Sequence, residues 1–109
     1  MEEFLSQVKQ LIKKPNGFQF IKRRKNMKAL NKHGLTIDIA KMYIRSLKVI
    51  NYFEGPVEDR DLSGYVWKFG KIINGKMFYI KLKIKKEKLL CCISFHDAEY
   101  EIESFPFKE

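Results

Sequence analysis

The chain has 109 residues, 45% of them hydrophobic, which suits one folded domain over residues 1–109 and is too little for two independent cores. Lys and Arg number 22 against 13 Asp and Glu, and the whole net charge of +9 lies in residues 1–50, which indicates a polyanionic partner such as nucleic acid. The sequence has no apolar run long enough to span a membrane and no pair of cysteines placed to form a disulfide. It also lacks Cys and His residues at the spacing of metal ligands and any nucleotide-binding motif. We expect a cytoplasmic protein without a secretory signal, membrane contact, metal or cofactor.

Apolar residues at helical spacing predict helices over residues 2–14 and 37–48, and a candidate cap at Asn26 with a stop at His33-Gly34 predicts a short helix over residues 26–32. Asn26 and Thr36 are expected to cap the second and third helices, because their side chains can accept hydrogen bonds from N–H groups of the first turn. Between the first two helices, alternating polarity predicts a short strand over residues 17–22.

From residue 49 the hydrophobic period changes to two, which predicts strands over residues 49–54, 65–73, 76–84 and 89–96. Gly55-Pro56 is expected to end the first of these strands. N-terminal helices followed by an antiparallel β-sheet meander make an α+β fold. Phe105-Pro106-Phe107 is expected to pin the acidic tail to the body of the protein.

Asn74-Gly75 predicts a two-residue hairpin turn, since both central positions of a type I′ turn need positive φ. Counting back from this turn places Lys68 opposite Lys81 and Gly70 opposite Tyr79.

Extending the pattern across a second turn over residues 85–88 places Tyr79 opposite Ser94 and Met77 opposite His96. The same pattern assigns Phe53 to the core and Cys92 to the opposite face.

One face of the predicted sheet collects polar side chains: Glu54, Lys68, Tyr79, Lys81, Lys83, Ser94 and His96. Such groups can cleave a phosphodiester without a metal, because a base activates a ribose 2′-OH, cations stabilise the transition state and an acid protonates the leaving oxygen. Glu54 is the predicted base, and His96, with an unperturbed pKa of about 6.5, is the predicted acid. The plain alternative is the solvated, Lys-rich face of an antiparallel sheet.

Short segments along nearly the whole chain resemble the motility quorum-sensing regulator (MqsR) toxins, which belong to the RelE-like messenger-RNA interferases. The segments are Phe4–Lys9, Ala29-Leu30, Gly34-Leu35, Val66-Trp67, Phe78–Leu82 and Ile93–Phe95. The resemblance implies a RelE-like α+β fold, metal-independent endoribonuclease activity on single-stranded messenger RNA, and neutralisation by a cognate antitoxin. It places the catalytic residues at Glu54, Lys68, Tyr79 and His96, of which Tyr79 has the residue type of the MqsR pattern.

Further basic residues are candidates for binding RNA or phosphate: Lys81, Lys83, Lys71, Arg23 and Arg24. Two other functions stay open. One is a non-catalytic RNA- or DNA-binding module in which Trp67, Tyr52 and Tyr65 stack on bases. The other is a protein-interaction domain that docks a partner through its acidic tail and basic helices.

Overall fold

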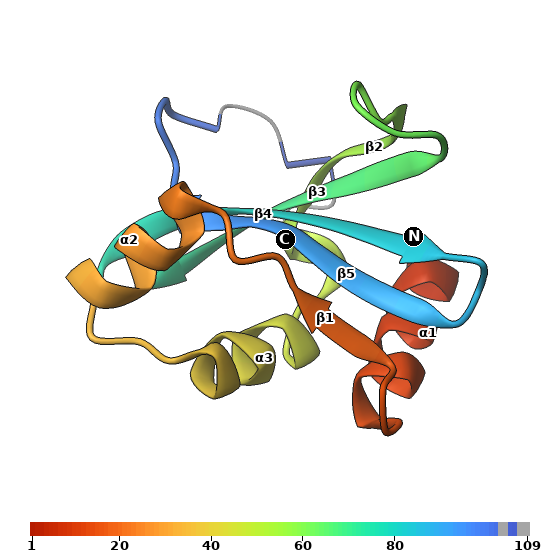
Figure 1. Cartoon of the computed structure of the whole chain (residues 1–109). Helices are drawn as coiled ribbons and strands as arrows, with labels where there is room; N and C mark the ends of the chain where they lie inside the picture. Colours follow the sequence, from red (N-terminus) through yellow and green to blue (C-terminus); the bar gives the residue numbers. More distant parts are fainter. Residues whose placement is uncertain (103–104, 107–109) are drawn as a thin grey trace.

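Three helices and a five-stranded sheet make up the fold, so the predicted α+β class is confirmed (Figure 1). The computed structural model describes residues 1–102 and 105–106. The helices are α1 (Glu2–Lys13), α2 (Arg24–Lys32) and α3 (Ile37–Arg45). The strands are β1 (Phe18–Phe20), β2 (Tyr52–Glu58), β3 (Tyr65–Ile73), β4 (Lys76–Lys85) and β5 (Leu89–Asp97), and a 3₁₀ helix over Val49–Asn51 replaces the start of the predicted first long strand.

The strands lie in the order β1-β5-β4-β3-β2 (Figure 1). β2 to β5 form the predicted antiparallel meander, and β1 adds a short parallel strand beside β5. The helices pack on one face of the sheet, while the β2–β3 loop and the segment after β5 rise over the other (Figure 1). We call this second face, which carries Lys68, Lys81 and Ser94, the open face.

The core lies between the sheet and the helices. Phe69, Ile80 and Phe95 stand in register across β3, β4 and β5, and all three are fully buried. Val8 of α1 and Ile44 of α3 are fully buried in the same cluster. Because side chains alternate along a strand, this core assigns the intervening residues to the open face.

The β3–β4 hairpin has the predicted register. Asn74 and Gly75 adopt positive φ, 51° and 80°, as a type I′ turn requires. Lys68 lies opposite Lys81 and Gly70 opposite Tyr79. The two lysines are therefore direct cross-strand neighbours on the open face.

The predicted β4–β5 register is wrong, because the turn is one residue shorter than expected. Lys85 pairs with Leu89, and both Lys86 and Glu87 adopt positive φ, 50° and 58°. A shift of one residue turns a side chain to the other face of a sheet. Cys92 therefore lies in the core, fully buried, and not on the open face.

A β-bulge at Ile93 adds a second shift to β5. Beyond it Ser94 lies opposite Lys81 and His96 opposite Tyr79, each two residues from the predicted pairing. A total shift of two residues preserves the face, so Ser94 and His96 still belong to the open face.

Strand β2 also departs from the prediction. It continues past Gly55-Pro56, with irregular pairing on both sides of Glu54. Phe53 is not a core residue: its ring lies 6.0 Å from that of Tyr79 on the open face, and Tyr52 packs against the core instead. The irregular pairing allows Phe53 and Glu54, neighbours in the chain, to reach the same face.

The two predicted helix caps differ in outcome. Thr36 caps α3, where its hydroxyl accepts a backbone N–H at 3.1 Å. Asn26 does not cap α2 but lies inside it, fully buried. Its side chain donates to the carbonyls of Ile21 and Ile93, at 2.9 Å each, and accepts from the N–H of Phe95 at 2.9 Å. Asn26 thus fastens α2 to β5.

Candidate active site

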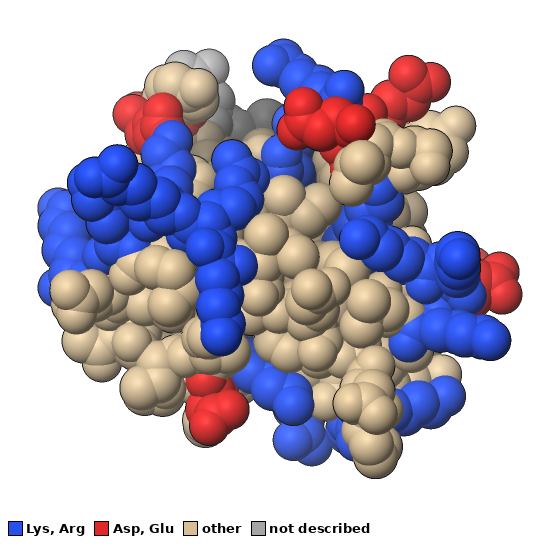
Figure 2. Space-filling model, in the orientation of Figure 1, with Lys and Arg blue, Asp and Glu red and all other residues tan. Residues whose placement is uncertain are grey.

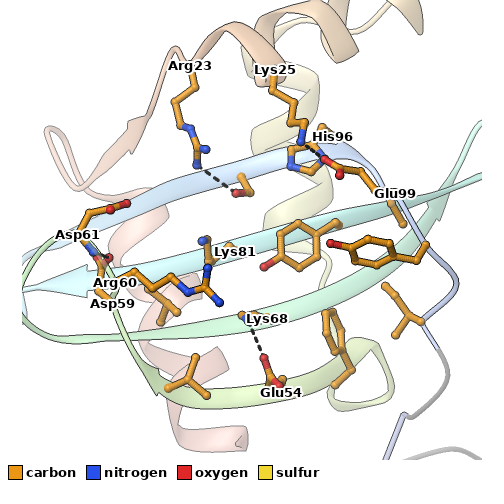
Figure 3. Close-up of a pocket in the computed structure, with 18 of the residues that line it drawn as sticks. Arg23, Lys25, Glu54, Asp59, Arg60, Asp61, Lys68, Lys81, His96 and Glu99 are labelled. Atoms are coloured by element: carbon orange, nitrogen blue, oxygen red, sulfur yellow. Dashed lines mark hydrogen bonds and ion pairs between the residues drawn. The ribbon is translucent and has the colours of Figure 1, made fainter.

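A groove of about 1000 Å³ lies on the open face (Figure 3). Its floor consists of side chains from β2, β3, β4 and β5, with Arg23 and Lys25 at the start of α2 beside them, and its walls are the β2–β3 loop and the segment after β5. The lining includes these residues singled out from the sequence: Glu54, Lys68, Tyr79, Lys81, Ser94, His96 and Arg23. The fold therefore brings the four predicted catalytic residues together, with two of the five predicted phosphate-binding residues.

Glu54 and Lys68 are cross-strand partners on β2 and β3. Lys68 Nζ lies 2.5 Å from a carboxylate oxygen of Glu54 (Figure 3). Burial disfavours the charge of Lys68, but the hydrogen bond with Glu54 and the proximity of Tyr79 outweigh burial, so the pKa of Lys68 is raised. Lys68 remains a cation, and Glu54 is held by it.

Tyr79 and His96 stand side by side in the groove. Their ring centroids are 5.4 Å apart and their planes 41° apart. Burial raises the pKa of Tyr79, although the ammonium of Lys68 opposes the shift. The phenol therefore keeps its proton at neutral pH and can donate a hydrogen bond to an anion.

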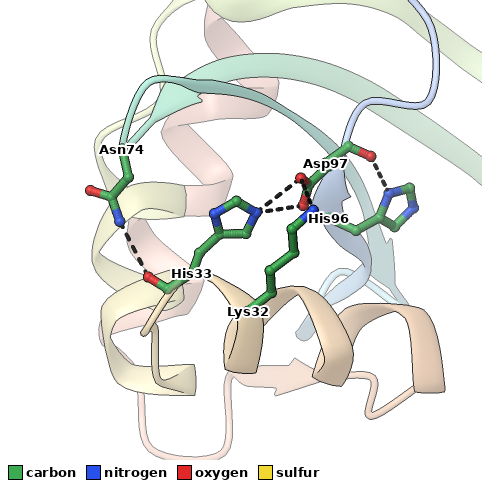
Figure 4. A network of polar contacts seen from close by, with 5 residues as sticks. All are labelled: Lys32, His33, Asn74, His96 and Asp97. Atoms are coloured by element: carbon green, nitrogen blue, oxygen red, sulfur yellow. Dashed lines mark hydrogen bonds and ion pairs between the residues drawn. The ribbon is translucent and has the colours of Figure 1, made fainter.

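The imidazole of His96 has a defined tautomer. Its Nδ1 lies 2.9 Å from the backbone carbonyl oxygen of Asp97 (Figure 4). A carbonyl oxygen can only accept, so Nδ1 carries the proton and Nε2 of the neutral ring holds the lone pair. Burial lowers the pKa of His96; the Asp97 carbonyl opposes this, and the charges of Lys25 and Arg23 reinforce it. The ring is neutral at pH 7 and can accept a proton at Nε2.

Lys81 and Arg23 complete the cationic floor (Figure 3). Burial lowers the pKa of Lys81, and the charges of Lys68 and Arg23 lower it further. Among the described residues no carboxylate forms an ion pair with Lys81. Arg23 Nη1 lies 3.5 Å from Ser94 Oγ, and Ser94 is the cross-strand partner of Lys81. This part of the floor can attract an oxyanion.

Lys83, predicted to bind phosphate, is not in the groove lining. Its side chain is 6% exposed, and Nζ lies 2.8 Å from the Asp59 carboxylate and 2.5 Å from the Ser63 carbonyl oxygen. The hydrogen bond from Lys83 lowers the pKa of Asp59 to about 2, with further help from the N–H of Asp61. Lys83 therefore anchors the β2–β3 loop and has no place for a phosphate.

Two other predicted phosphate-binding residues also lie outside the groove. Lys71 pairs with Phe78, a core residue, so its position belongs to the helix-covered face. Arg24 is exposed in the first turn of α2 and is absent from the groove lining. Lys and Arg side chains gather over α2 at the left of Figure 2. Acidic side chains lie along the upper edge of the molecule in the same view. Basic charge thus extends beyond the groove on the side of α2.

Sequence reasoning missed the walls of the groove. The β2–β3 loop contributes Asp59, Arg60 and Asp61, and the segment after β5 contributes Glu99 and other residues. Glu99 forms an ion pair with Lys25 at the start of α2 (Figure 3). The acidic composition of both segments against a basic sheet was the available signal, but loops have no periodicity from which to place them.

Part of the predicted pin of the acidic tail is confirmed. The ring of Phe105 lies 6.1 Å from that of Phe53. A Cβ on Gly70 would lie 2.9 Å from Phe105 and 2.8 Å from Ile102, so the absent side chain of Gly70 makes room for the tail. Phe107 lies outside the described residues.

The aromatic residues of the non-catalytic alternative are mostly turned away from the groove. Trp67 stacks on Phe4 of α1, with ring centroids 4.4 Å apart. Tyr52 packs against the same core. Tyr65 is 57% exposed, so one of the three predicted stacking residues is available to a base.

Comparisons with protein-family models, with curated proteins and with solved structures find no match. The resemblance to MqsR toxins therefore stays a prediction, and function must be argued from the groove. Over residues 1–102 and 105–106, no helix is long and apolar enough to cross a bilayer, and no group of three or more His, Cys, Asp or Glu is placed to hold a metal ion.

Proposed function

We propose that the protein is a metal-independent endoribonuclease that cleaves single-stranded RNA through attack by a ribose 2′-OH. The observation that carries the proposal is the meeting of His96, Tyr79 and Lys81 on the floor of one groove. A neutral imidazole, a protonated phenol and a cation supply the base, the hydrogen-bond donor and the charge that this reaction needs.

In the proposed reaction, Nε2 of His96 takes the proton of the 2′-OH. The 2′-oxygen forms a bond to the adjacent phosphorus, and the bond between phosphorus and the 5′-oxygen breaks. Lys81 gives a proton to the leaving oxygen, because its lowered pKa makes it a better acid than an ordinary lysine. The products are a 2′,3′-cyclic phosphate and a 5′-OH, and Lys68 and Tyr79 stabilise the extra negative charge in the transition state.

The geometry favours His96 rather than Glu54 as the base. One Glu54 oxygen is bound to Lys68 at 2.5 Å, whereas His96 lines the groove and its Nε2 carries a lone pair. We therefore assign Glu54 the role of holding Lys68 in place.

The biological setting of this proposal comes from the sequence resemblance. We propose a toxin of a type II toxin–antitoxin system, with messenger RNA as its substrate and a cognate antitoxin that covers the cationic groove. The net charge of +9 and the basic floor support an RNA substrate and an acidic partner surface. Induced expression in bacteria should arrest growth and degrade messenger RNA, and a harmless protein that is abundant and folded would contradict the toxin assignment.

The direct test uses purified protein and a labelled single-stranded RNA, with and without EDTA. Cleavage should persist in EDTA and leave 2′,3′-cyclic phosphate ends. Replacing the nucleotide at the cut site by its 2′-deoxy form should abolish that cut, because no 2′-OH remains. Arg24→Gln, outside the groove, is the matched control and should cleave normally. RNA binding without cleavage would contradict the proposal and favour the non-catalytic binding module.

A further inference from the structure

The chain has two histidines, and both contact Asp97 (Figure 4). His96 lies in the groove and bonds to the backbone carbonyl of Asp97. Since successive side chains of a strand point to opposite faces, the Asp97 side chain leaves the groove and turns toward α2. There it meets His33, the residue that ends α2.

The contact between His33 and Asp97 is close and sheltered. Nε2 of His33 lies 2.8 Å and 2.9 Å from the two carboxylate oxygens, and the imidazole is 10% exposed. Burial opposes the charge of Asp97, but the hydrogen bond and the charge of His33 outweigh it, so the pKa of Asp97 is lowered. The carboxylate is therefore ionised, and His33 donates to it.

His33 is itself held by two further contacts, one to its ring and one to its backbone. The ring packs edge-on against Phe78, with centroids 5.0 Å apart. Its backbone carbonyl accepts a hydrogen bond from the Asn74 side chain at 3.3 Å. Lys32 also approaches Asp97, but at 3.5 Å and with 68% of its side chain exposed, so its attraction is screened by solvent.

Asp97 is the last residue of β5, where the sheet no longer holds the chain on both sides. The next residue, Ala98, still donates its N–H to the Met77 carbonyl at 2.8 Å. The Asp97 carbonyl belongs to the same planar peptide unit as this N–H, so the bond to Met77 holds the plane from one side, and the contact of His33 with the Asp97 side chain holds it from the other. That carbonyl is the acceptor that keeps the proton of His96 on Nδ1.

We infer that His33 is a positioning residue for His96: by holding the Asp97 carboxylate from the helix side of the sheet, it orients the Asp97 carbonyl that presents Nε2 of His96 to the groove. The inference rests on the proposed function for its catalytic meaning. Its structural content, the control of the His96 tautomer by a residue on the other face, can be measured without RNA.

The first measurement is the ¹⁵N chemical shifts of the two imidazoles in protein labelled at histidine. In the wild type His96 should be the Nδ1–H tautomer. His33→Phe keeps a ring against Phe78 but removes the donor to Asp97, and should shift His96 toward the Nε2–H tautomer that free histidine prefers. His33→Gln restores an N–H donor and should return part of the Nδ1–H population. Lys32→Gln, beside the same carboxylate, is the control and should leave His96 unchanged.

The second measurement is RNA cleavage by the same proteins. His33→Phe should lower kcat by about tenfold with little change in KM, the low end of the loss seen when the partner that orients a metal-binding histidine is removed. Arg23 and Lys25, the other charged residues near His96, and Tyr79 beside it are unchanged in these variants, so they cannot account for the difference.

Asp97→Asn is a second route to the same result, since it keeps the shape and the backbone carbonyl but removes the charge that attracts His33. It should shift the His96 tautomer in the same direction by a smaller amount. An unchanged His96 tautomer in either folded variant would overturn the inference, whatever the cleavage assay shows. Full cleavage by His96→Gln would instead overturn the proposed function and leave the tautomer result standing.

Discussion

Tyr79 and His96 face each other directly across β4 and β5, with their rings 5.4 Å apart on the open face. This pairing results from the short β4–β5 turn and the bulge at Ile93, each of which shifts the register of His96 by one residue. A phosphate that reaches the imidazole is therefore also within reach of the phenol. In our proposal the pair therefore places the general base, His96, beside Tyr79, which donates a hydrogen bond to the phosphate.

Replacing His96 by Gln should lower kcat for RNA cleavage by about 10²–10⁴-fold, the usual contribution of a general base. Gln keeps the size and polarity but cannot accept and release the proton. Tyr79→Phe should cause a smaller loss, since it removes one hydrogen bond to the phosphate. Single-turnover cleavage of a labelled RNA measures both. Equal activity of wild type and His96→Gln would remove His96 from the mechanism.

Cleavage should fall on the acid side of the pH profile with a midpoint below 6.5. The base must be neutral, and burial together with the charges of Lys25 and Arg23 lowers the pKa of His96. Lys25→Gln removes one of these charges and frees the Glu99 carboxylate, so both effects should raise the pKa. The acid limb of log kcat against pH should move to higher pH in Lys25→Gln. A limb that stays in place would show that another group controls it.

The sequence predicted the part of the fold that local chemistry determines. Asn74-Gly75 imposes a turn type, and the register of Lys68 and Lys81 follows from it. The next turn gave no such signal, because Lys86 and Glu87 adopt positive φ without the Gly or Asn that usually marks it. The open face was still predicted correctly for His96, since the combined shift was an even number of residues.

The groove walls and the His33–Asp97 contact depended on tertiary packing. Residues 33 and 97 meet only after α2 has docked on β5, and the buried Asn26 secures this docking through hydrogen bonds to the bulged residue Ile93 and to Phe95. No periodicity in the sequence reports such a contact. The same holds for Lys83. The alternation of side chains along its strand predicted an exposed cation, but the ion pair with Asp59 buries it.

Asp59→Asn should destabilise the protein at neutral pH. The pKa of Asp59 is about 2 against an ordinary 3.8, and because solvent screens part of the attraction, the corresponding figure of about 2 kcal/mol of unfolding free energy is the upper limit of its contribution. Because the folded-state pKa is lowered, this stabilisation is present above about pH 4 and is lost as the pH falls toward 2. Urea unfolding at pH 7 and at pH 2.5 measures the change, and the variant should differ from the wild type much less at the lower pH.

Asp61→Asn is the control for this measurement. Asp61 lies in the same loop, its N–H donates to Asp59 at 3.0 Å, and its carboxylate forms no ion pair with any described residue. Its replacement should change the unfolding free energy by less than about 0.5 kcal/mol, as is usual for a surface substitution. Equal destabilisation by both substitutions would mean that loop charge in general, and not the Asp59–Lys83 pair, stabilises the loop.

Lys81→Gln should separate the stability of the fold from its activity. Lys81 and Lys68 are direct cross-strand neighbours, and two cations about 4 Å apart repel by about 1 kcal/mol in water and about 4 kcal/mol at an intermediate dielectric constant. Glu54 offsets part of this repulsion through its ion pair with Lys68. Removing Lys81 should therefore raise the melting temperature slightly in chloride while it lowers kcat more than RNA affinity.

An anion bound at the phosphate site should reverse the same repulsion. Sulfate at equal ionic strength should raise the melting temperature of the wild type more than that of Lys81→Gln, because the bound dianion attracts both lysines. Lys76→Gln, exposed at the start of the same strand, is the matched control and should respond to sulfate as the wild type does. If sulfate stabilises all three proteins equally and cleavage is unchanged in Lys81→Gln, Lys81 is surface charge and takes no part in catalysis.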